Sequence, residues 1–285
     1  MSDFQPDERL SLGSLFKRFY GKIAVTWTLT LCETALYALI PLLIGWSIDD
    51  LLAGRWEMFL WLLALFATLL IVATGRRVYD TRAYGTMRVA MGRAQFTRRA
   101  DAPVSTANAR VLMGRELVDF LEQETPAAMT AFVEVIVAVA ILLTFHNVLA
   151  LSAGGSAIVL TVIFAISARA FFNRNAALNA QSEKQVDALT SRNLRSVTHH
   201  FRSLRRHEVR LSDLESLVYG VIFLVLLSML AFNLWFTATQ LNASPGDIFA
   251  VVTYSFTFVE SAVALPIVLQ SLTRLTELTR RINDS

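Results

Sequence analysis

Six apolar stretches of 18 to 25 residues follow one another along the chain, and polar connections separate them. At a rise of 1.5 Å per residue, each stretch is about long enough to cross a hydrocarbon core of roughly 30 Å as a helix. We therefore predict an all-α membrane protein with six membrane-spanning helices. The predicted spans are residues 24–48, 58–75, 127–145, 148–168, 217–236 and 248–270.

The connections between the spans alternate between short and long. The three short ones are about 49–55, 146–147 and 237–247, and the two long ones are 76–126 and 169–216. Both long connections keep apolar residues at helical spacing. We expect the neighbouring spans to continue into them as helices. The result is two long helical hairpins on one side of the membrane, with turns near 102–103 and 191–193.

The basic residues identify that side. Of the 26 Lys and Arg residues, 25 fall on the side of the long connections, and only Arg55 falls on the other. The positive-inside rule makes the crowded side cytoplasmic, so both termini are expected in the cytoplasm. Attraction to anionic headgroups accounts for the formal charge of +3. We expect an integral protein of the bacterial inner (plasma) membrane, with the lipid bilayer and not nucleic acid as its partner.

Three carboxylates lie inside the predicted spans: Glu33, Glu134 and Glu260, each within about three residues of the centre. A charge at that depth costs about 2.5–3.5 kcal/mol, and the predicted spans contain no Lys or Arg to pair with it. One interpretation is that each is protonated and hydrogen-bonds a neighbouring helix. We favour a functional one, in which carboxyl groups at one depth gain and lose protons and couple solute movement to proton movement.

Hydroxyl side chains accompany these carboxylates at spacings of three and four, which place them on one helical face. The pattern Thr-x3-Thr-x2-Glu occurs in both the first and the sixth span. Such a face is expected to line a helix contact or a wet cavity. The predicted cavity-lining residues are Thr26, Thr30, Tyr37, Thr130, Thr253 and Thr257. Pro266 is a candidate hinge in the last span, because proline kinks a helix.

Three short sequence segments are informative when they are taken together with their order along the chain. Residues 11–22 form an amphipathic segment typical of an interfacial helix. The first span contains Ile-Pro-Leu-Leu-Ile-Gly at 40–45, and Pro-Gly-Asp-Ile-Phe-Ala at 245–250 opens the last. Together with the two hairpins, this order resembles the transmembrane domain of the exporter-type ABC transporters.

The resemblance implies a cytoplasmic N-terminus with an elbow helix over 1–23, followed by a six-helix transmembrane domain over 24–285. It also implies a homodimer around a central cavity. The first two helices of one protomer are expected to pack against helices three to six of the other. In that family, short coupling helices at the hairpin tips dock onto ATPase domains.

The sequence departs from the family in the parts that concern ATP. It contains no Walker A pattern, the Gly-rich loop that ends in Gly-Lys-Ser/Thr and holds phosphates. We therefore expect no nucleotide-binding domain. The spans also lack the spacing of a nucleophile and its base or of metal ligands, so we expect no enzyme activity, no catalytic residue, no metal and no cofactor. The second hairpin tip has Arg192, Asn193 and Ser196 where the family often has an acidic residue and a Gly.

These observations lead to three hypotheses about function. The leading one is a proton-coupled transporter that moves an amphipathic or cationic solute or peptide through the cavity of a homodimer. In this the chain looks like the ATPase-free bacterial inner-membrane importers of peptides. An alternative is a membrane subunit of an ABC transporter whose ATPase is a separate polypeptide. A second alternative is a non-transporting membrane scaffold or receptor, in which the Glu residues are replaceable.

Overall fold

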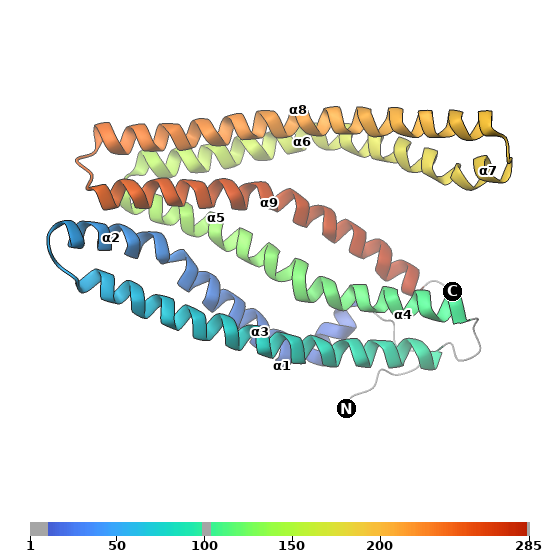
Figure 1. The fold of residues 1–285 in the computed structure, drawn as a ribbon, viewed down its shortest axis with the longest axis horizontal. Helices are drawn as coiled ribbons and strands as arrows, with labels where there is room; N and C mark the ends of the chain where they lie inside the picture. The colour runs from blue at the N-terminus through green and yellow to red at the C-terminus, as the bar shows by residue number, and fades with distance from the viewer. Residues whose placement is uncertain (1–10, 99–103, 284–285) are drawn as a thin grey trace.

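The structure is a computed structural model that describes residues 11–98 and 104–283. Within these residues it is helical and has no strand (Figure 1). In chain order the elements are α1 (Leu12–Ala38), α2 (Ile40–Leu52), α3 (Glu57–Arg98), α4 (Val104–Asp119), the π-helix η1 (Phe120–Glu124), α5 (Thr125–Phe145), α6 (Asn147–Glu183), α7 (Gln185–Thr190), α8 (Leu194–Gln240) and α9 (Pro245–Asn283).

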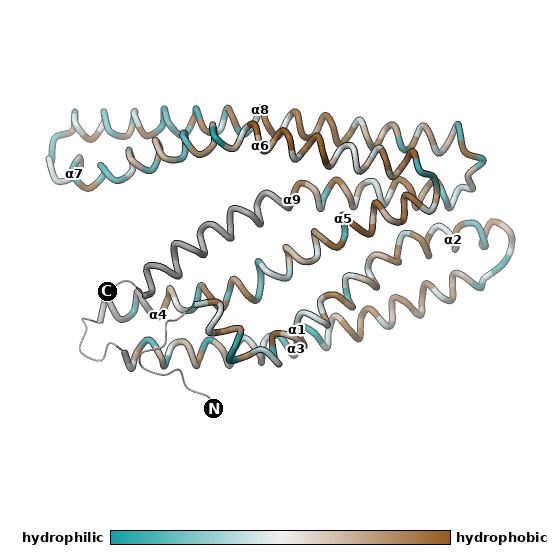
Figure 2. The backbone as a smooth tube through the Cα atoms, turned by 180° about the vertical axis from the view of Figure 1, so that it is seen from behind, coloured by the Kyte–Doolittle hydropathy of each residue, from teal (hydrophilic) through white to brown (hydrophobic). Residues whose placement is uncertain are grey.

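Within the described ranges, six stretches are long and apolar enough to cross a membrane, which confirms the six predicted spans. The helices α1 and α2 together form the first span, and α3, α5, α6, α8 and α9 carry the other five. Figure 2 shows that α6 and α8 are apolar in the half away from α7 and polar towards it. The polar ends of these two helices therefore extend beyond the membrane on one side.

The second hairpin has the predicted form. Both α6 and α8 continue past their apolar parts, and a turn over residues 191–193 joins α7 to α8. The side chain of Asn193 caps α8 by accepting a hydrogen bond from the backbone N–H of Arg195. In the first hairpin, α3 runs unbroken to Arg98. The turn predicted near 102–103 lies outside the described residues.

The first span is broken at Leu39 rather than continuous. Pro41 lies in the first turn of α2, where its missing N–H and its ring prevent α1 from continuing as one helix. The Ala38 carbonyl beside the break accepts a hydrogen bond from the hydroxyl of Tyr254 in α9, at 2.6 Å. This hydrogen bond from the sixth span therefore stabilises the break between α1 and α2.

The N-terminal part of α1 corresponds to the predicted elbow helix. A capping box between Ser11 and Ser14 begins it, and a kink at Phe19 separates it from the span. Leu15, Phe19 and Ile23 are buried in a cluster with residues of α3, α4 and η1. Its apolar face thus packs against protein instead of lying free in the interface.

At the side of the membrane that the basic residues predict to be the outer one, the ends of α2 and α9 touch backbone to backbone. A Cβ added to Gly45 would lie 2.6 Å from the Gly246 carbonyl oxygen. The Asp49 carboxylate accepts hydrogen bonds from the Gly246 N–H, at 2.9 Å, and from the Ser244 hydroxyl. A carboxylate at a helix N-terminus satisfies free N–H groups and complements the helix dipole. This Gly45–Asp49–Gly246 contact, which we call the outer clamp, joins the first span to the last.

The helices form two groups. The first span, α1 and α2, packs against α3, α5 and α9 of its own chain, whereas α6 and α8 form a pair that diverges from α3 and α4 (Figure 1). Buried Asn233 of α8 accepts a hydrogen bond from Ser152 of α6 and donates one to Ser255 of α9, at 2.9 Å. Such bonds hold membrane helices together. They join the α6–α8 pair to the rest at its outer end.

Candidate functional site

Four polar residues recur at intervals of four along α3: Arg76, Asp80, Tyr84 and Arg88. A spacing of four places side chains on one face of a helix. This face turns towards α1, α4 and η1, and the side chains of Arg76, Tyr84 and Arg88 each hydrogen-bond a residue of those helices. We call this row the α3 polar column, and it forms the candidate site.

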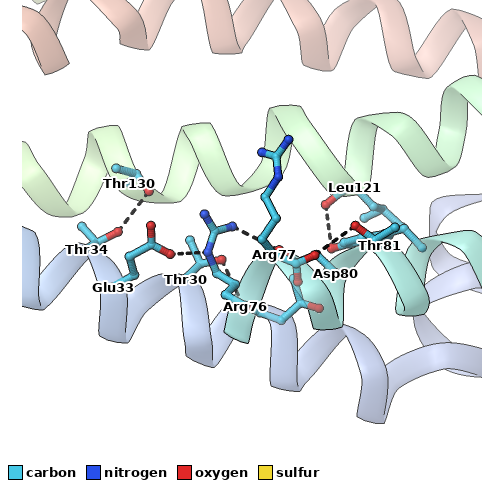
Figure 3. Close-up of polar contacts among 11 residues, drawn as sticks. Thr30, Glu33, Thr34, Arg76, Arg77, Asp80, Thr81, Leu121 and Thr130 are labelled. Carbon is cyan, nitrogen blue, oxygen red and sulfur yellow. Dashed lines mark hydrogen bonds and ion pairs between the residues drawn. The ribbon is translucent and has the colours of Figure 1, made fainter. Parts of the chain in front are cut away.

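We call the end of the column nearer the outer clamp its upper end. There, Arg76 lies between two carboxylates (Figure 3). Its Nε–H donates a hydrogen bond to Glu33 Oε2 of α1, and its Nη1–H donates one to Asp80 Oδ2 at 3.1 Å. The three side chains are 26%, 22% and 13% exposed in the order Arg76, Glu33, Asp80. One guanidinium thus serves two largely buried carboxylates.

The prediction that Glu33 has no basic partner is wrong. The helix α3 continues without a break through Gly75 into Arg76, so that Arg76 projects from the same rigid rod as the span. Arg76 lies 19 residues after the outer end of α3, and Glu33 lies 19 residues before the outer end of α2 at Leu52. At 1.5 Å per residue both lie about 28 Å from the turn that joins α2 to α3, near the opposite boundary of the membrane and not at the centre as predicted for Glu33.

Asp80 is the most buried carboxylate of this group. The residue is 9% exposed, and its Oδ1 has no hydrogen-bond partner among the described residues. The fully buried hydroxyl of Thr26 in α1 lies beside this carboxyl group, and it too lacks a partner within hydrogen-bond geometry. Buried polar atoms without partners are rare, so this point of the structure has unused hydrogen-bonding capacity.

The lower half of the column holds the π-helix η1. The buried Tyr84 hydroxyl donates a hydrogen bond to the Leu121 carbonyl, at 2.9 Å. Arg88 donates to Asp119 from Nε, at 2.8 Å, and to Glu122 from Nη2. A π-helical turn widens the backbone and is often found at functional sites. Here two residues of α3 bind it from one side.

Glu134 is placed differently from Glu33. Its Oε2 accepts a hydrogen bond from the Ser261 hydroxyl of α9, at 2.7 Å. One turn earlier, Thr130 shares a hydrogen bond with Thr34 of α1, at 3.1 Å (Figure 3). These two bonds connect α5 to the sixth and first spans. Thr130 therefore lies at a helix contact, which is one of the two environments predicted for it.

Glu260 is exposed on the surface of the chain, one residue before Ser261. On the same helix, Thr253 and Thr257 donate their hydroxyls to carbonyls one turn back in α9, at 2.8 and 3.1 Å. Among the described residues, no hydrogen bond joins Glu260 to Glu33 or to Glu134. The three carboxylates thus come from helices that pack together, but the structure does not gather them into one group.

The predicted polar face of the first span divides into two. Thr26 and Thr30 are buried, and the Thr30 hydroxyl donates to the Thr26 carbonyl at 3.0 Å. Tyr37, just before the break, is 61% exposed. Pro266 lies within α9, and its side chain is outside the part of the chain that is described, so the hinge stays a prediction.

Sequence reasoning missed Arg76, Asp80 and Tyr84, because it assigned everything after Gly75 to a cytoplasmic connection. The signal was present as the four-residue spacing of polar residues down to Arg88. Within the described residues, no group of three or more His, Cys, Asp or Glu side chains could hold a metal ion. The side chains of the column form ion pairs and can exchange protons.

Comparison with protein families gives a match over most of the chain. A family model described as "ABC transporter transmembrane region" matches residues 12–246. The matched part includes the α3 polar column, Glu33 and Glu134, and it ends at Gly246 of the outer clamp. No curated protein matches the sequence.

Proposed function

Because the chain belongs to the family of ABC transporter transmembrane regions, we propose that it moves an amphipathic or cationic solute or peptide across a bacterial inner membrane, driven by protons. Both termini are cytoplasmic in this proposal, and the pathway is a central cavity between two copies. The chain itself hydrolyses no ATP. Six spans and a buried polar column along one of them support a transporter over a scaffold.

The observation that carries proton coupling is the sharing of Arg76. Two carboxylates, Glu33 and Asp80, lie on different helices and hydrogen-bond to one guanidinium. Adding or removing a proton changes which carboxylate competes for Arg76, and thereby changes the contact between α1 and α3. Protonation at this site can therefore change the packing of α1 against α3, at the end of the transmembrane region away from the outer clamp.

Two exposed regions support a homodimer. On α9, Phe249, Phe256 and Glu260 are exposed at spacings of seven and four, which form one stripe. A glutamate on a lipid-facing stripe would cost about 2.5–3.5 kcal/mol, whereas a water-filled cavity between two copies accommodates it. In the cytoplasmic parts of the α6–α8 pair, Phe172 and Leu194 are 74% and 81% exposed. A second copy would cover them.

We therefore expect the purified protein to be a dimer. Native mass spectrometry from lipid nanodiscs should give twice the chain mass of 31.8 kDa. Replacing Phe172 and Leu194 with Ser should shift the population towards the monomer, because each change removes apolar area from the interface. Replacing Leu151, which is 73% exposed near the outer end of α6, is the control and should leave the mass unchanged. A single-chain mass for the wild type would contradict the dimer.

Proton-driven transport is tested in liposomes that contain only this protein. With an imposed pH gradient and no ATP, we expect accumulation of a fluorescent amphipathic cation and matching proton movement. Glu33→Gln should lower the initial rate at least tenfold, because Gln keeps the shape but removes the charge that competes with Asp80 for Arg76. Glu134→Gln and Glu260→Gln test the other predicted positions. Exposed Glu208 in the cytoplasmic part of α8 is the control position. Wild-type rates and an unchanged pH profile in all three Gln variants would make these carboxylates structural.

A separate ATPase subunit is the second candidate. The observation that favours it is α7, a six-residue helix at the tip of the second hairpin, with Val186 and Leu189 71% and 51% exposed. The family resemblance places a coupling helix at such a tip. Under this candidate an ATPase should copurify from native membranes, and solute should move only when ATP is added. Transport by the isolated chain without ATP excludes it.

A further inference from the structure

The upper end of the α3 polar column, together with Glu33 of α1, contains more negative than positive charge. Among the described residues, Arg76 is the one cation that hydrogen-bonds to Glu33 and to Asp80. Arg77 follows it directly, but its side chain is exposed and points away from the carboxylates (Figure 3). At the lower end, Arg88 is occupied by Asp119 and Glu122. With both upper carboxylates ionised, this buried group would carry one uncompensated negative charge.

Burying an uncompensated charge is costly, and a carboxylate in that position is neutralised by binding a proton. The two candidates differ in their surroundings. Glu33 receives the Nε–H of Arg76 and is about one-fifth exposed, whereas Asp80 is more buried and its second oxygen has no partner among the described residues. Of the two carboxylates, Asp80 is therefore the one whose ionised form is buried at the greater cost and whose free oxygen can bind a proton.

We propose that Asp80 is a protonation site that takes up a proton from the cytoplasmic side. The carboxylate accepts the proton from water and becomes a neutral acid, and the new O–H is available to the neighbouring Thr26 hydroxyl. Arg76 then remains paired with Glu33, so that the pair is neutral overall. When Asp80 releases the proton, Arg76 is again shared between α1 and α3.

The position of Asp80 determines the side of access. Asp80 lies five residues beyond the apolar stretch that ends at Gly75, and below it the column continues through Tyr84 to Arg88 and Glu122. These groups lead towards the cytoplasmic hairpin and away from the outer clamp. This inference rests on the proposed proton coupling, and it assigns the coupling proton to a residue other than the three predicted glutamates.

Infrared difference spectroscopy tests the site directly on the purified protein in lipid. Lowering the pH from 8 to 6 should produce the C=O stretch of a protonated carboxyl group, although exposed aspartates stay ionised there. The band should be lost in Asp80→Asn, which keeps the size and an acceptor oxygen for Arg76. It should persist in Asp213→Asn, a change at an exposed position in α8. Persistence of the whole band in Asp80→Asn would overturn the proposal.

A transport measurement separates this inference from the proposed function. In liposomes, Asp80→Asn should lose accumulation driven by a pH gradient but retain exchange of solute down its own gradient. If Asp80→Asn accumulates solute at the wild-type rate, the assignment to Asp80 is wrong and proton coupling stands. If the wild type shows no dependence on the pH gradient but the infrared band depends on Asp80, proton coupling fails and the protonation site stands.

Discussion

Replacing Arg76 by alanine should lower the free energy of unfolding by about 3 kcal/mol, because removal of one partner leaves buried charges unpaired. Two carboxylates, Glu33 and Asp80, would lose the only guanidinium that both contact among the described residues. The value is at the lower end of the range for buried pairs, since the Arg76 side chain is 26% exposed. Equilibrium unfolding in mixed micelles measures the change.

Two further variants show whether charge is the cause. Arg76→Ala combined with Glu33→Gln and Asp80→Asn should recover most of the lost stability, because both unpaired charges are then removed. Arg77→Ala, at an exposed position one residue along, should change stability by less than about 0.5 kcal/mol. If Arg76→Ala is no less stable than Arg77→Ala, the ion pairs contribute nothing measurable and the proposed switch loses its basis.

Replacing Gly246 by alanine should destabilise the protein by about 3 kcal/mol or more, because it overpacks a backbone contact that cannot yield. The added Cβ would lie 2.0 Å from the Gly45 carbonyl oxygen and 2.5 Å from Asp49 Oδ2. Either α2 and α9 must separate or the Asp49 hydrogen bonds must break. Thermal unfolding in detergent measures the loss.

Gly220 offers a matched control in the fifth span. A Cβ added there meets nothing within 4 Å, so Gly220→Ala should be neutral or stabilise by up to about 1 kcal/mol through helix propensity. Both variants replace a glycine with alanine, but Gly246→Ala should lower the free energy of unfolding, whereas Gly220→Ala should leave it unchanged or raise it. Equal unfolding temperatures for the Gly246 and Gly220 variants would show that the outer ends of α2 and α9 are not in close contact.

The spans and the second hairpin were predictable because their signals are local. Hydropathy over about 20 residues identifies a helix that crosses lipid, whatever it packs against. The turn near 191–193 follows from the loss of apolar spacing at that point. Gly45 and Gly246 stood out as parts of two phrases, but their mutual contact depends on how α2 and α9 cross, and no local pattern contains that crossing.

The partners of the buried carboxylates could not be predicted either, because they too depend on how helices pack against one another. Which helix faces Glu33 depends on the tilt and rotation of α1 against α3, and these are set by packing between residues distant in sequence, such as Leu15 and Tyr84. The prediction also ended the second span at the last apolar residue. A helix does not end where its hydropathy changes, and an arginine just beyond that point can still reach a neighbour.

The break at Leu39 divides the first span between two mechanical units. Above it, α2 is attached to α9 by the outer clamp, and Tyr254 of α9 binds the Ala38 carbonyl at the break itself. Below it, Glu33 is attached to α3 through Arg76. A displacement of the outer half against the inner half therefore needs backbone rotation at only one residue of this span. The first span thus has a joint at Leu39, with Glu33, which competes with Asp80 for Arg76, on one side of it and the outer clamp on the other.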